Sequence, residues 1–373
     1  MNAILFITHP QFMFERIGGL TVLERQLFTA KRAGLDKIWI NGQKPNDKAL
    51  AALRLPEGLT LVWSSEEDAA KQCRPPYFVI SADNFTRVAA LREIIAKPPQ
   101  FPLAYNGGKG APVVEAVPFA VDRNPTWRSQ PMPEGSYAPI SLDCANKKAL
   151  VSWLMVIGNK PQDGFMARNF DRHISQAVSR RLLNTSVTPN MMTIFSSALG
   201  LLGAAFFLVP SHAARLAGAL LIWLHSVLDG CDGELARLRY QESAFGGDLD
   251  FWGDNLVHQA LFSCLSIGFY REGLGVVSLV LGLAACAGSL GSAWLAYKKR
   301  VAQRQNPNPA PVRQTDITKN LSALEDSLAA RDFIYLLVVL AAINLVYPFL
   351  WAAAIGSAVF FFMTLYLRRI KNE

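Results

Sequence analysis

The chain has 373 residues, long enough for two domains of ordinary size, and with 18% charged residues and a mean hydropathy of +0.19 it is apolar for a soluble protein. The formal net charge is +8, but much of the Lys and Arg flanks apolar segments, so the charge indicates membrane orientation and we expect no nucleic-acid partner. The five cysteines are scattered without a CxxC pair, which argues against a disulfide framework or a zinc site.

Residues 1–150 alternate short apolar runs with Pro, Gly and charge, and we predict a soluble α/β domain there. Residues 20–33 have helical periodicity that stops at Gly34, a common residue after a helix. Strands are predicted at residues 3–7, 37–41, 59–63 and 77–81. Alternating strands and helices favour a mostly parallel sheet. Residues 1–14 contain no Lys or Arg and do not resemble a signal peptide, so we expect this domain in the cytoplasm.

Residues 151–187 are predicted to form a linker that contains a basic amphipathic helix. From residue 160 onward, basic and apolar side chains interleave. They are Arg168, Phe170, Arg172, His173, Ile174, Val178, Arg180, Arg181 and Leu182. Such a helix would lie along the membrane surface. The alternative is an ordinary solvated helix of the N-terminal domain.

Residues 188–373 contain six apolar segments near the ~20 residues that cross a bilayer. The segments are 191–209, 213–230, 253–270, 274–296, 332–347 and 349–367. Only Tyr347 and Pro348 separate the last two, which predicts a tight helical hairpin. Lys and Arg gather between the second and third segments, between the fourth and fifth, and after the sixth, so the positive-inside rule places these regions in the cytoplasm. We therefore predict an all-α, multi-pass domain of six transmembrane helices in the cytoplasmic membrane.

Four aspartates lie where the second and third apolar segments face each other: Asp229, Asp232, Asp250 and Asp254. Residues three or four apart share a helix face, so two helices can direct all four carboxylates at one centre. Carboxylates that close repel one another unless cations neutralise them, and an all-oxygen ligand set favours Mg²⁺ or Mn²⁺. Two such ions suit displacement at a phosphorus centre. The alternative is a cluster of helix-end charges paired with local Arg.

These aspartates belong to the longer pattern D-x2-D-G-x2-A-R-x8-G-x3-D-x3-D, in which every defined position is matched. The pattern resembles the signature of the CDP-alcohol phosphotransferases, also called CDP-alcohol phosphatidyltransferases, and the resemblance covers about residues 160–370. It implies a six-helix membrane fold that commonly forms homodimers, with two divalent metal ions (Mg²⁺ or Mn²⁺) bound at the cytoplasmic face. It also implies transfer of a phosphoalcohol group from a CDP-linked donor to an acceptor hydroxyl with release of CMP, as in phospholipid biosynthesis.

The resemblance implies a role for each matched residue. Asp229, Asp232 and Asp250 would bind one metal ion, and Asp229, Asp250 and Asp254 the other. Asp254 would also be the general base that removes the acceptor's proton. The CDP pocket would be formed by Gly233, Ala236, Arg237 and Gly246. Residues 188–190 match the family as well, although Pro in the first turn of a helix accounts for them equally.

The N-terminal domain resembles a sugar- or inositol-phosphate nucleotidyltransferase over residues 20–41. Residues 160–164, followed by Arg172 and Ser175, resemble the junction of fused enzymes in which an inositol-phosphate cytidylyltransferase precedes a phosphotransferase. An active domain of that kind needs a Gly-rich loop with Lys or Arg after the first strand, and residues 8–14 contain neither. Asp83 follows an apolar strand where such enzymes keep a metal-binding Asp, with an Asp that caps a turn as the alternative. We predict that this domain is catalytically inactive and serves for binding, for positioning or for stability alone.

Three functions compete. The first is a phosphotransferase with an inactive N-terminal domain and a CDP-diacylglycerol or CDP-inositol-like donor. Its acceptor is unknown, and Lys160, Arg172 and Arg180 suit either an anionic acceptor or anionic lipid headgroups. The second is a bifunctional enzyme whose N-terminal domain makes the CDP-alcohol. The third is a divalent-ion transporter or membrane scaffold, against which the intact Gly233 and Arg237 argue, because ion passage needs neither.

Overall fold

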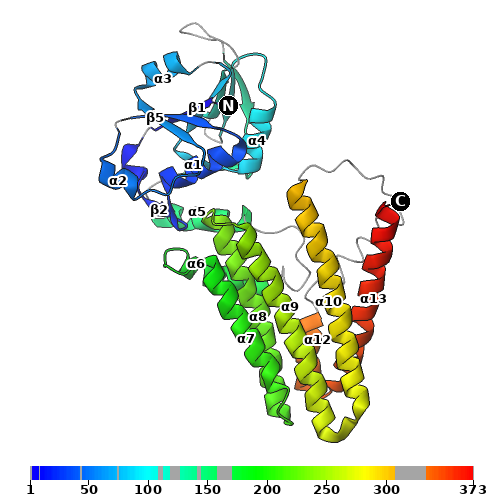
Figure 1. The fold of residues 1–373 in the computed structure, drawn as a ribbon. Helices are drawn as coiled ribbons and strands as arrows, with labels where there is room; N and C mark the ends of the chain where they lie inside the picture. Colours follow the sequence, from blue (N-terminus) through cyan, green and yellow to red (C-terminus); the bar gives the residue numbers. More distant parts are fainter. Residues whose placement is uncertain are drawn as a thin grey trace. The chain divides into compact units, whose positions relative to one another are not determined.

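The computed structural model describes residues 2–7, 9–42, 44–73, 75–107, 112–117, 127–140, 144–157, 170–306 and 333–372. The chain divides into two compact units, one of Met1–Asn159 with Leu238–Tyr240 and one of Lys160–Arg237 with Gln241–Glu373. The first unit is built on a β-sheet and the second is helical (Figure 1), so the predicted α/β and all-α regions are confirmed. The junction at residues 160–164 and Arg168 lie outside the described residues.

A seven-stranded sheet forms the centre of the first unit, in the order β10-β8-β9-β6-β1-β4-β5. The strands are β1 (Asn2–Phe6), β4 (Lys37–Asn41), β5 (Thr60–Ser64), β6 (Tyr77–Ser81), β8 (Leu103–Asn106), β9 (Pro112–Val117) and β10 (Arg128–Pro131). β9 is antiparallel to β6 and β8, whereas the other neighbours are parallel. The four predicted strands are present to within one residue, and the sheet is mostly parallel as predicted.

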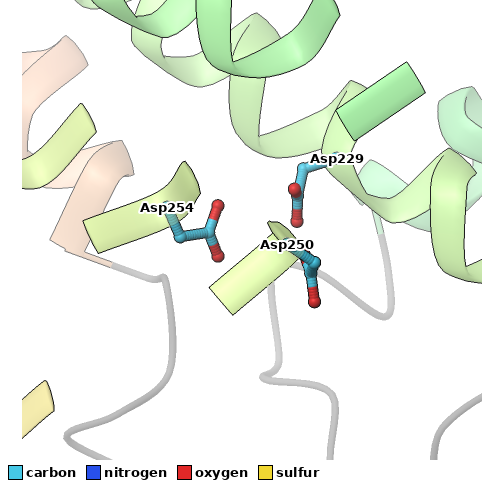
Figure 2. A group of neighbouring side chains, drawn as sticks. All are labelled: Asp229, Asp250 and Asp254. Atoms are coloured by element: carbon cyan, nitrogen blue, oxygen red, sulfur yellow. The ribbon is translucent and has the colours of Figure 1, made fainter. Parts of the chain in front are cut away.

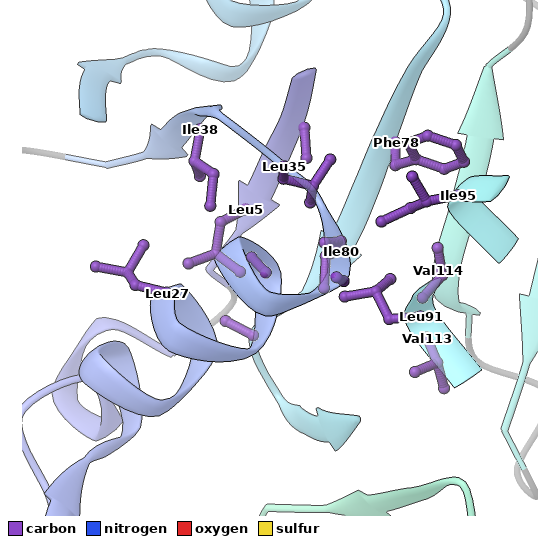
Figure 3. Close-up of a cluster of buried hydrophobic side chains, with 14 of the residues drawn as sticks. Leu5, Leu27, Leu35, Ile38, Phe78, Ile80, Leu91, Ile95, Val113 and Val114 are labelled. Atoms are coloured by element: carbon purple, nitrogen blue, oxygen red, sulfur yellow. The ribbon is translucent and has the colours of Figure 1, made fainter. Parts of the chain in front are cut away.

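The two faces of the sheet are covered by different helices. Leu5 of β1 and Ile38 of β4 pack on α1 (Val22–Ala33) and α4 (Val88–Ala96), in the cluster drawn in Figure 3. The intervening residues Ile4 and Trp39 face α3 (Glu66–Gln72) instead. Successive side chains of a strand point to opposite faces, so apolar runs of this kind are buried on both sides.

The predicted helix at residues 20–33 is α1, and its ends have local causes. The Thr21 hydroxyl accepts a hydrogen bond from the Glu24 amide, while the Glu24 carboxylate accepts one from the Thr21 amide. This reciprocal arrangement satisfies two amides that would otherwise lack partners at the helix start. Gly34 ends the helix with a φ of 105°, a conformation that favours glycine.

Smaller elements complete the first unit. They are the 3₁₀ helix η1 (Pro10–Phe12), the helices α2 (Asp47–Ala51) and α5 (Cys144–Ile157), and the strand pairs β2 (Arg16–Ile17) with β3 (Leu20–Thr21) and β7 (Asn84–Thr86) with β11 (Tyr137–Pro139). The chain passes from β1 to η1 within a few residues, and Gly18 and Gly19 form the turn between β2 and β3.

The second unit is a set of long helices around a common apolar core. They are α7 (Pro189–Phe206), α8 (His212–Leu238), α9 (Ala244–Phe269), α10 (Val276–Gln305), α12 (Phe333–Ala342) and α13 (Tyr347–Asn372), with a π-helical turn η3 (Tyr270–Leu274) before α10. Among the described residues, α7, α8, α10 and α13 are long and apolar enough to cross a membrane, judged by length and composition alone. The predicted third span falls in α9, which carries acidic residues, and the fifth in the shorter apolar helix α12. The spans assigned to α9 and α12 therefore stay predictions.

The hairpin between the last two helices turns earlier than predicted. α12 ends at Ala342, and Asn344 takes a positive φ of 59°, a conformation that Asn tolerates better than most residues. The predicted turn residues Tyr347 and Pro348 instead begin α13. Proline suits the first turn of a helix because its missing N–H would have no partner there.

The predicted amphipathic helix at residues 160–187 contains α6 (Arg172–Leu182), and its buried face differs from a typical apolar stripe. Ser175 and Ser179 are buried, whereas Phe170 and Ile174 are exposed. Ser175 and Ser179 thus face the rest of the second unit, whereas Phe170 and Ile174 face away from it. The placement of this helix on a membrane surface stays a prediction.

Candidate active site

Three of the four predicted carboxylates meet between α8 and α9. Asp229 extends from α8 and is buried, while Asp250 and Asp254 extend from consecutive turns of α9 and are partly exposed. One oxygen from each carboxyl group lies within 4.8 Å of the others (Figure 2). Such a group of carboxylate oxygens fits the ligand preference of a hard divalent cation.

Asp232 is held slightly apart from these three. It lies one turn after Asp229 on α8 and is buried, and one of its carboxylate oxygens accepts a short hydrogen bond from the Thr193 hydroxyl of α7. The carbonyl oxygen of Pro189 lies 3.3 Å from the same hydroxyl oxygen, as a second and more distant acceptor for its one hydrogen. The structure thus gathers Asp229, Asp250 and Asp254 at one point and holds Asp232 toward α7.

A cavity of about 150 Å³ opens beside the aspartates. Six residues of the sequence pattern line it: Asp232, Gly233, Ala236, Arg237, Gly246 and Asp250. Further lining residues were not singled out from the sequence for a pocket role, and they are Pro189, Asn190, Thr193, Gln241, Glu242, Ser243, Gly247 and Arg300. Arg300 comes from the end of α10, some fifty residues beyond the pattern, so no local signal connects it with the cavity.

Two glycines of the pattern leave space for polar side chains. A Cβ atom on Gly233 would lie 2.9 Å from Nη1 of Arg237, one turn later on α8. A Cβ atom on Gly246 would lie 2.9 Å from the side-chain oxygen of Asn190 and 3.0 Å from the Ser243 hydroxyl that caps α9. Both glycines therefore permit close approach of polar groups at the edge of the cavity.

His225 is a site residue that sequence reasoning missed. Its Nδ1 lies 2.9 Å from the carbonyl oxygen of Ser196, and because a carbonyl only accepts, Nδ1 is the donor. Its Nε2 then faces Asp254, 3.6 Å from Oδ1. His225 precedes Asp229 by four residues on α8, and this spacing was the one local signal available.

The first turn of α9 is fastened by basic residues of α10. Arg304 donates from two nitrogens to the two carboxylate oxygens of Asp248, at 2.9 and 2.8 Å. Arg300 donates to the carbonyl of Gly247 at 2.7 Å. The hydrogen bonds from Arg304 hold the pKa of the Asp248 carboxyl below its usual value. These contacts orient the helix that carries Asp250 and Asp254.

In the first unit, Asp83 follows β6 and lies near the carboxyl end of β1. Its Oδ1 is 3.3 Å from Nδ1 of His9. Asp83 is partly exposed and His9 is exposed. Among the described residues, no metal-binding group of three or more acidic, His or Cys side chains includes Asp83.

Known proteins resemble parts of this chain. The family model described as CDP-alcohol phosphatidyltransferase matches residues 186–315. The bifunctional IPC transferase and DIPP synthase of Thermococcus kodakarensis is 38% identical over 135 residues, which cover 36% of this chain and 29% of that protein. The protein of the same description from Archaeoglobus fulgidus is 42% identical over 122 residues, or 32% of this chain and 24% of that protein. The matched regions span less than a third of these relatives.

Among solved structures, phosphatidylinositol phosphate synthase of Mycobacterium tuberculosis with CDP-DAG bound is 19% identical, with a TM-score of 0.37. The match covers 52% of this chain and 93% of that one. The matched family region at residues 186–315 contains the whole aspartate pattern and every described residue that lines the cavity. Residues 186–315 of this chain are therefore the region that is similar to the CDP-alcohol phosphatidyltransferases.

Proposed function

We propose that the protein transfers a phosphoalcohol group from a CDP-linked donor to an acceptor hydroxyl and releases CMP. The observation that supports this most directly is the group of three carboxylates, Asp229, Asp250 and Asp254, beside a cavity lined by the rest of the family pattern. A transporter or scaffold would need the carboxylates but not Gly233 and Arg237 next to them.

The carboxylates suit two divalent metal ions, Mg²⁺ or Mn²⁺. Three oxygens within 4.8 Å, from one buried and two partly exposed aspartates, provide charge and ligand atoms for one ion, and Asp232 one turn away extends the set toward a second. Asp229, Asp232 and Asp250 would hold the first ion, and Asp229, Asp250 and Asp254 the second. When bound, the ions would neutralise charge that develops on the phosphate oxygens.

The chain's own residues would bind the donor and move one proton. Arg237 would bind the donor's diphosphate, with Gly233, Ala236 and Gly246 giving it access to the cavity wall. The Asp254 carboxylate would accept the proton of the acceptor hydroxyl. The acceptor oxygen then forms a bond to the phosphorus that carries the alcohol, and the bond from that phosphorus to the bridging oxygen breaks. CMP leaves with the electron pair of that bond.

The same proposal covers the membrane arrangement, the oligomeric state, the donor and the N-terminal domain. We infer a multi-pass protein of the cytoplasmic membrane with six spans, a cytoplasmic active site and a homodimeric state. The donor would be CDP-diacylglycerol or a soluble CDP-alcohol of the CDP-inositol type. The N-terminal domain would be inactive, because a single Asp83 paired with His9 offers less than the triphosphate-binding loop and metal site that nucleotidyl transfer needs.

Asp254→Asn tests the reaction. The variant should lose CMP-dependent exchange and product formation, because its amide cannot accept the acceptor's proton. Mass spectrometry of products formed from candidate CDP donors and membrane extract would measure this and identify donor and acceptor together. Asp47→Asn, an exposed change in the first unit, is the control and should keep full activity. Full activity in Asp254→Asn would remove this residue from the mechanism.

A bifunctional enzyme is the second candidate, because four relatives of this chain are described as bifunctional. The seven-stranded sheet with its antiparallel β9 also offers a fold on which a nucleotidyltransferase-like site could be built. Release of pyrophosphate from CTP by the full-length protein, with an inositol phosphate as co-substrate, would support this candidate. No release above that of an Asp83→Asn variant would exclude it.

A further inference from the structure

Helix α6 packs against the face of α8 that points away from the carboxylate group. The Cys231 thiol lies 3.4 Å from the carbonyl oxygen of Ser175. A Cβ atom on Gly230 would lie 3.6 Å from Cβ of the same serine, at ordinary van der Waals distance. The two helices are therefore in close contact at the level of Asp229 and Asp232.

A buried ion pair joins the two helices at this level. Nη1 of Arg172 donates to Oε1 of Glu234 at 2.7 Å, and the Ser175 hydroxyl donates to the same oxygen at 2.8 Å. The side chains of Arg172 and Glu234 are 12% and 3% exposed. Oε2 of Glu234 is buried and accepts no hydrogen bond from the residues that the structure describes. Arg172, considered from the sequence for an anionic ligand, is thus engaged with a carboxylate of its own chain.

A pair of this kind is poorly explained by stability alone. Burial removes both charges from water, and a well-packed apolar pair at the same positions is often equally stable or more so. What the charged pair adds is direction, because Oε1 of Glu234 accepts hydrogen bonds from two donors of α6, Arg172 and Ser175, and these together fix where the carboxylate points.

The ion pair of Arg172 and Glu234 holds α8 on the side opposite Asp232. Residues two positions apart in the sequence are separated by about 200° around the helix axis, so Glu234 and Asp232 point in nearly opposite directions. Thr193 of α7 holds Asp232 by a hydrogen bond, and Arg172 with Ser175 holds Glu234 from α6. Helix α6 is itself fastened at its start, where Asp171 accepts a hydrogen bond from Tyr335 of α12. The end of α8 is therefore held from two sides against rotation.

We propose that Arg172 and Glu234 are positioning residues whose ion pair sets the rotation of α8, and with it the directions of Asp229 and Asp232. Helix α6 is then part of the active-site scaffold as well as a surface helix. The inference rests on the metal-binding role proposed above for the aspartates.

The test uses full-length protein with Arg172→Met, Glu234→Leu and the double variant. Three quantities are measured: Tm without metal, the Mn²⁺ dissociation constant, and hydrogen exchange of the backbone amides over residues 229–236. Each single change should lower Tm, because it leaves one buried charge unpaired. The double variant should regain the wild-type Tm, yet bind Mn²⁺ about 10-fold more weakly or worse and exchange faster over residues 229–236. Arg181→Met, an exposed change on α6, should alter none of the three.

A double variant that regains Mn²⁺ affinity and wild-type exchange together with Tm would overturn the inference, because the pair would then only stabilise. If wild-type protein binds no Mn²⁺, the proposed metal function fails by itself. Hydrogen exchange then still decides the positioning role, and rates equal to wild type in the double variant would reject it. Should a single variant fail to fold, Glu234→Gln, which keeps the shape and an acceptor for Ser175, replaces it.

Discussion

Single residues determine the charge at the centre of the second unit. Oxygens of Asp229, Asp250 and Asp254 lie within 4.8 Å of one another, so their negative charges repel unless a cation is bound.

A ligand that binds only the folded state stabilises it by mass action. We expect Mn²⁺ to raise the Tm of wild-type protein and EDTA to reverse the increase. Asp250→Asn should abolish the increase, whereas Asp47→Asn should retain it. An undiminished increase in Asp250→Asn would show that the ion binds elsewhere.

His225 is a second single residue whose effect can be tested. Its ring is oriented by the Ser196 carbonyl and faces Asp254, and it is not among the described residues that line the cavity. We expect His225→Asn to lower kcat about 10-fold or more, as loss of an outer-shell partner does at other metal sites, while the KM for the donor changes little. Steady-state kinetics with a saturating acceptor would measure both constants. A raised KM with unchanged kcat would instead place His225 in donor binding.

At the scale of elements, α9 is held at both ends. Arg300 and Arg304 of α10 fasten its first turn, and Gly268 near its last turn lies against the backbone that directly follows α7. A Cβ atom on Gly268 would clash with the carbonyl oxygen of Phe207, and backbone atoms there cannot move aside as a flexible side chain could.

Gly268→Ala should therefore destabilise the second unit by about 1–3 kcal/mol, the range found for overpacked cores. The matched control is Gly356→Ala in α13, where a Cβ atom would meet nothing within 4 Å and the Tm should not fall. Thermal unfolding of the two purified variants would compare them. Equal stability would mean that α7 and α9 can separate without cost.

For the whole molecule, the arrangement in the membrane is the main prediction. From the distribution of Lys and Arg we predict that the end of α10 lies in the cytoplasm and the turn between α7 and α8 outside. In a cysteine-free background, Ser211→Cys should react with a membrane-impermeant thiol reagent in intact spheroplasts. Gln303→Cys should react only after permeabilisation. Reaction of both from the same side would contradict the six-span arrangement.

The sequence pattern and the structure agree where the signal is local. The helix at residues 20–33 has its capping residues and its terminal glycine within the segment itself, and the strands are continuous apolar runs. The hairpin before α13 was misplaced because Pro348 suggests a break, whereas proline also begins helices well. Polar residues of α9, with Asn255, His258 and Gln259 beside Asp254, lower its mean hydropathy, so α9 is not among the described helices that are apolar enough to cross a membrane by composition.

By itself, the sequence determined that the chain has an α/β part and a helical part, and that four aspartates lie on two consecutive helices. Those features follow from periodicity and spacing, which act between residues a few positions apart. Only the tertiary structure decided that Asp232 is held by Thr193 apart from the other three, that His225 faces Asp254, and that Arg172 forms an ion pair with Glu234. The partners in each pair are 29 to 62 residues apart and lie on different helices, so their contact depends on how whole helices pack and rotate.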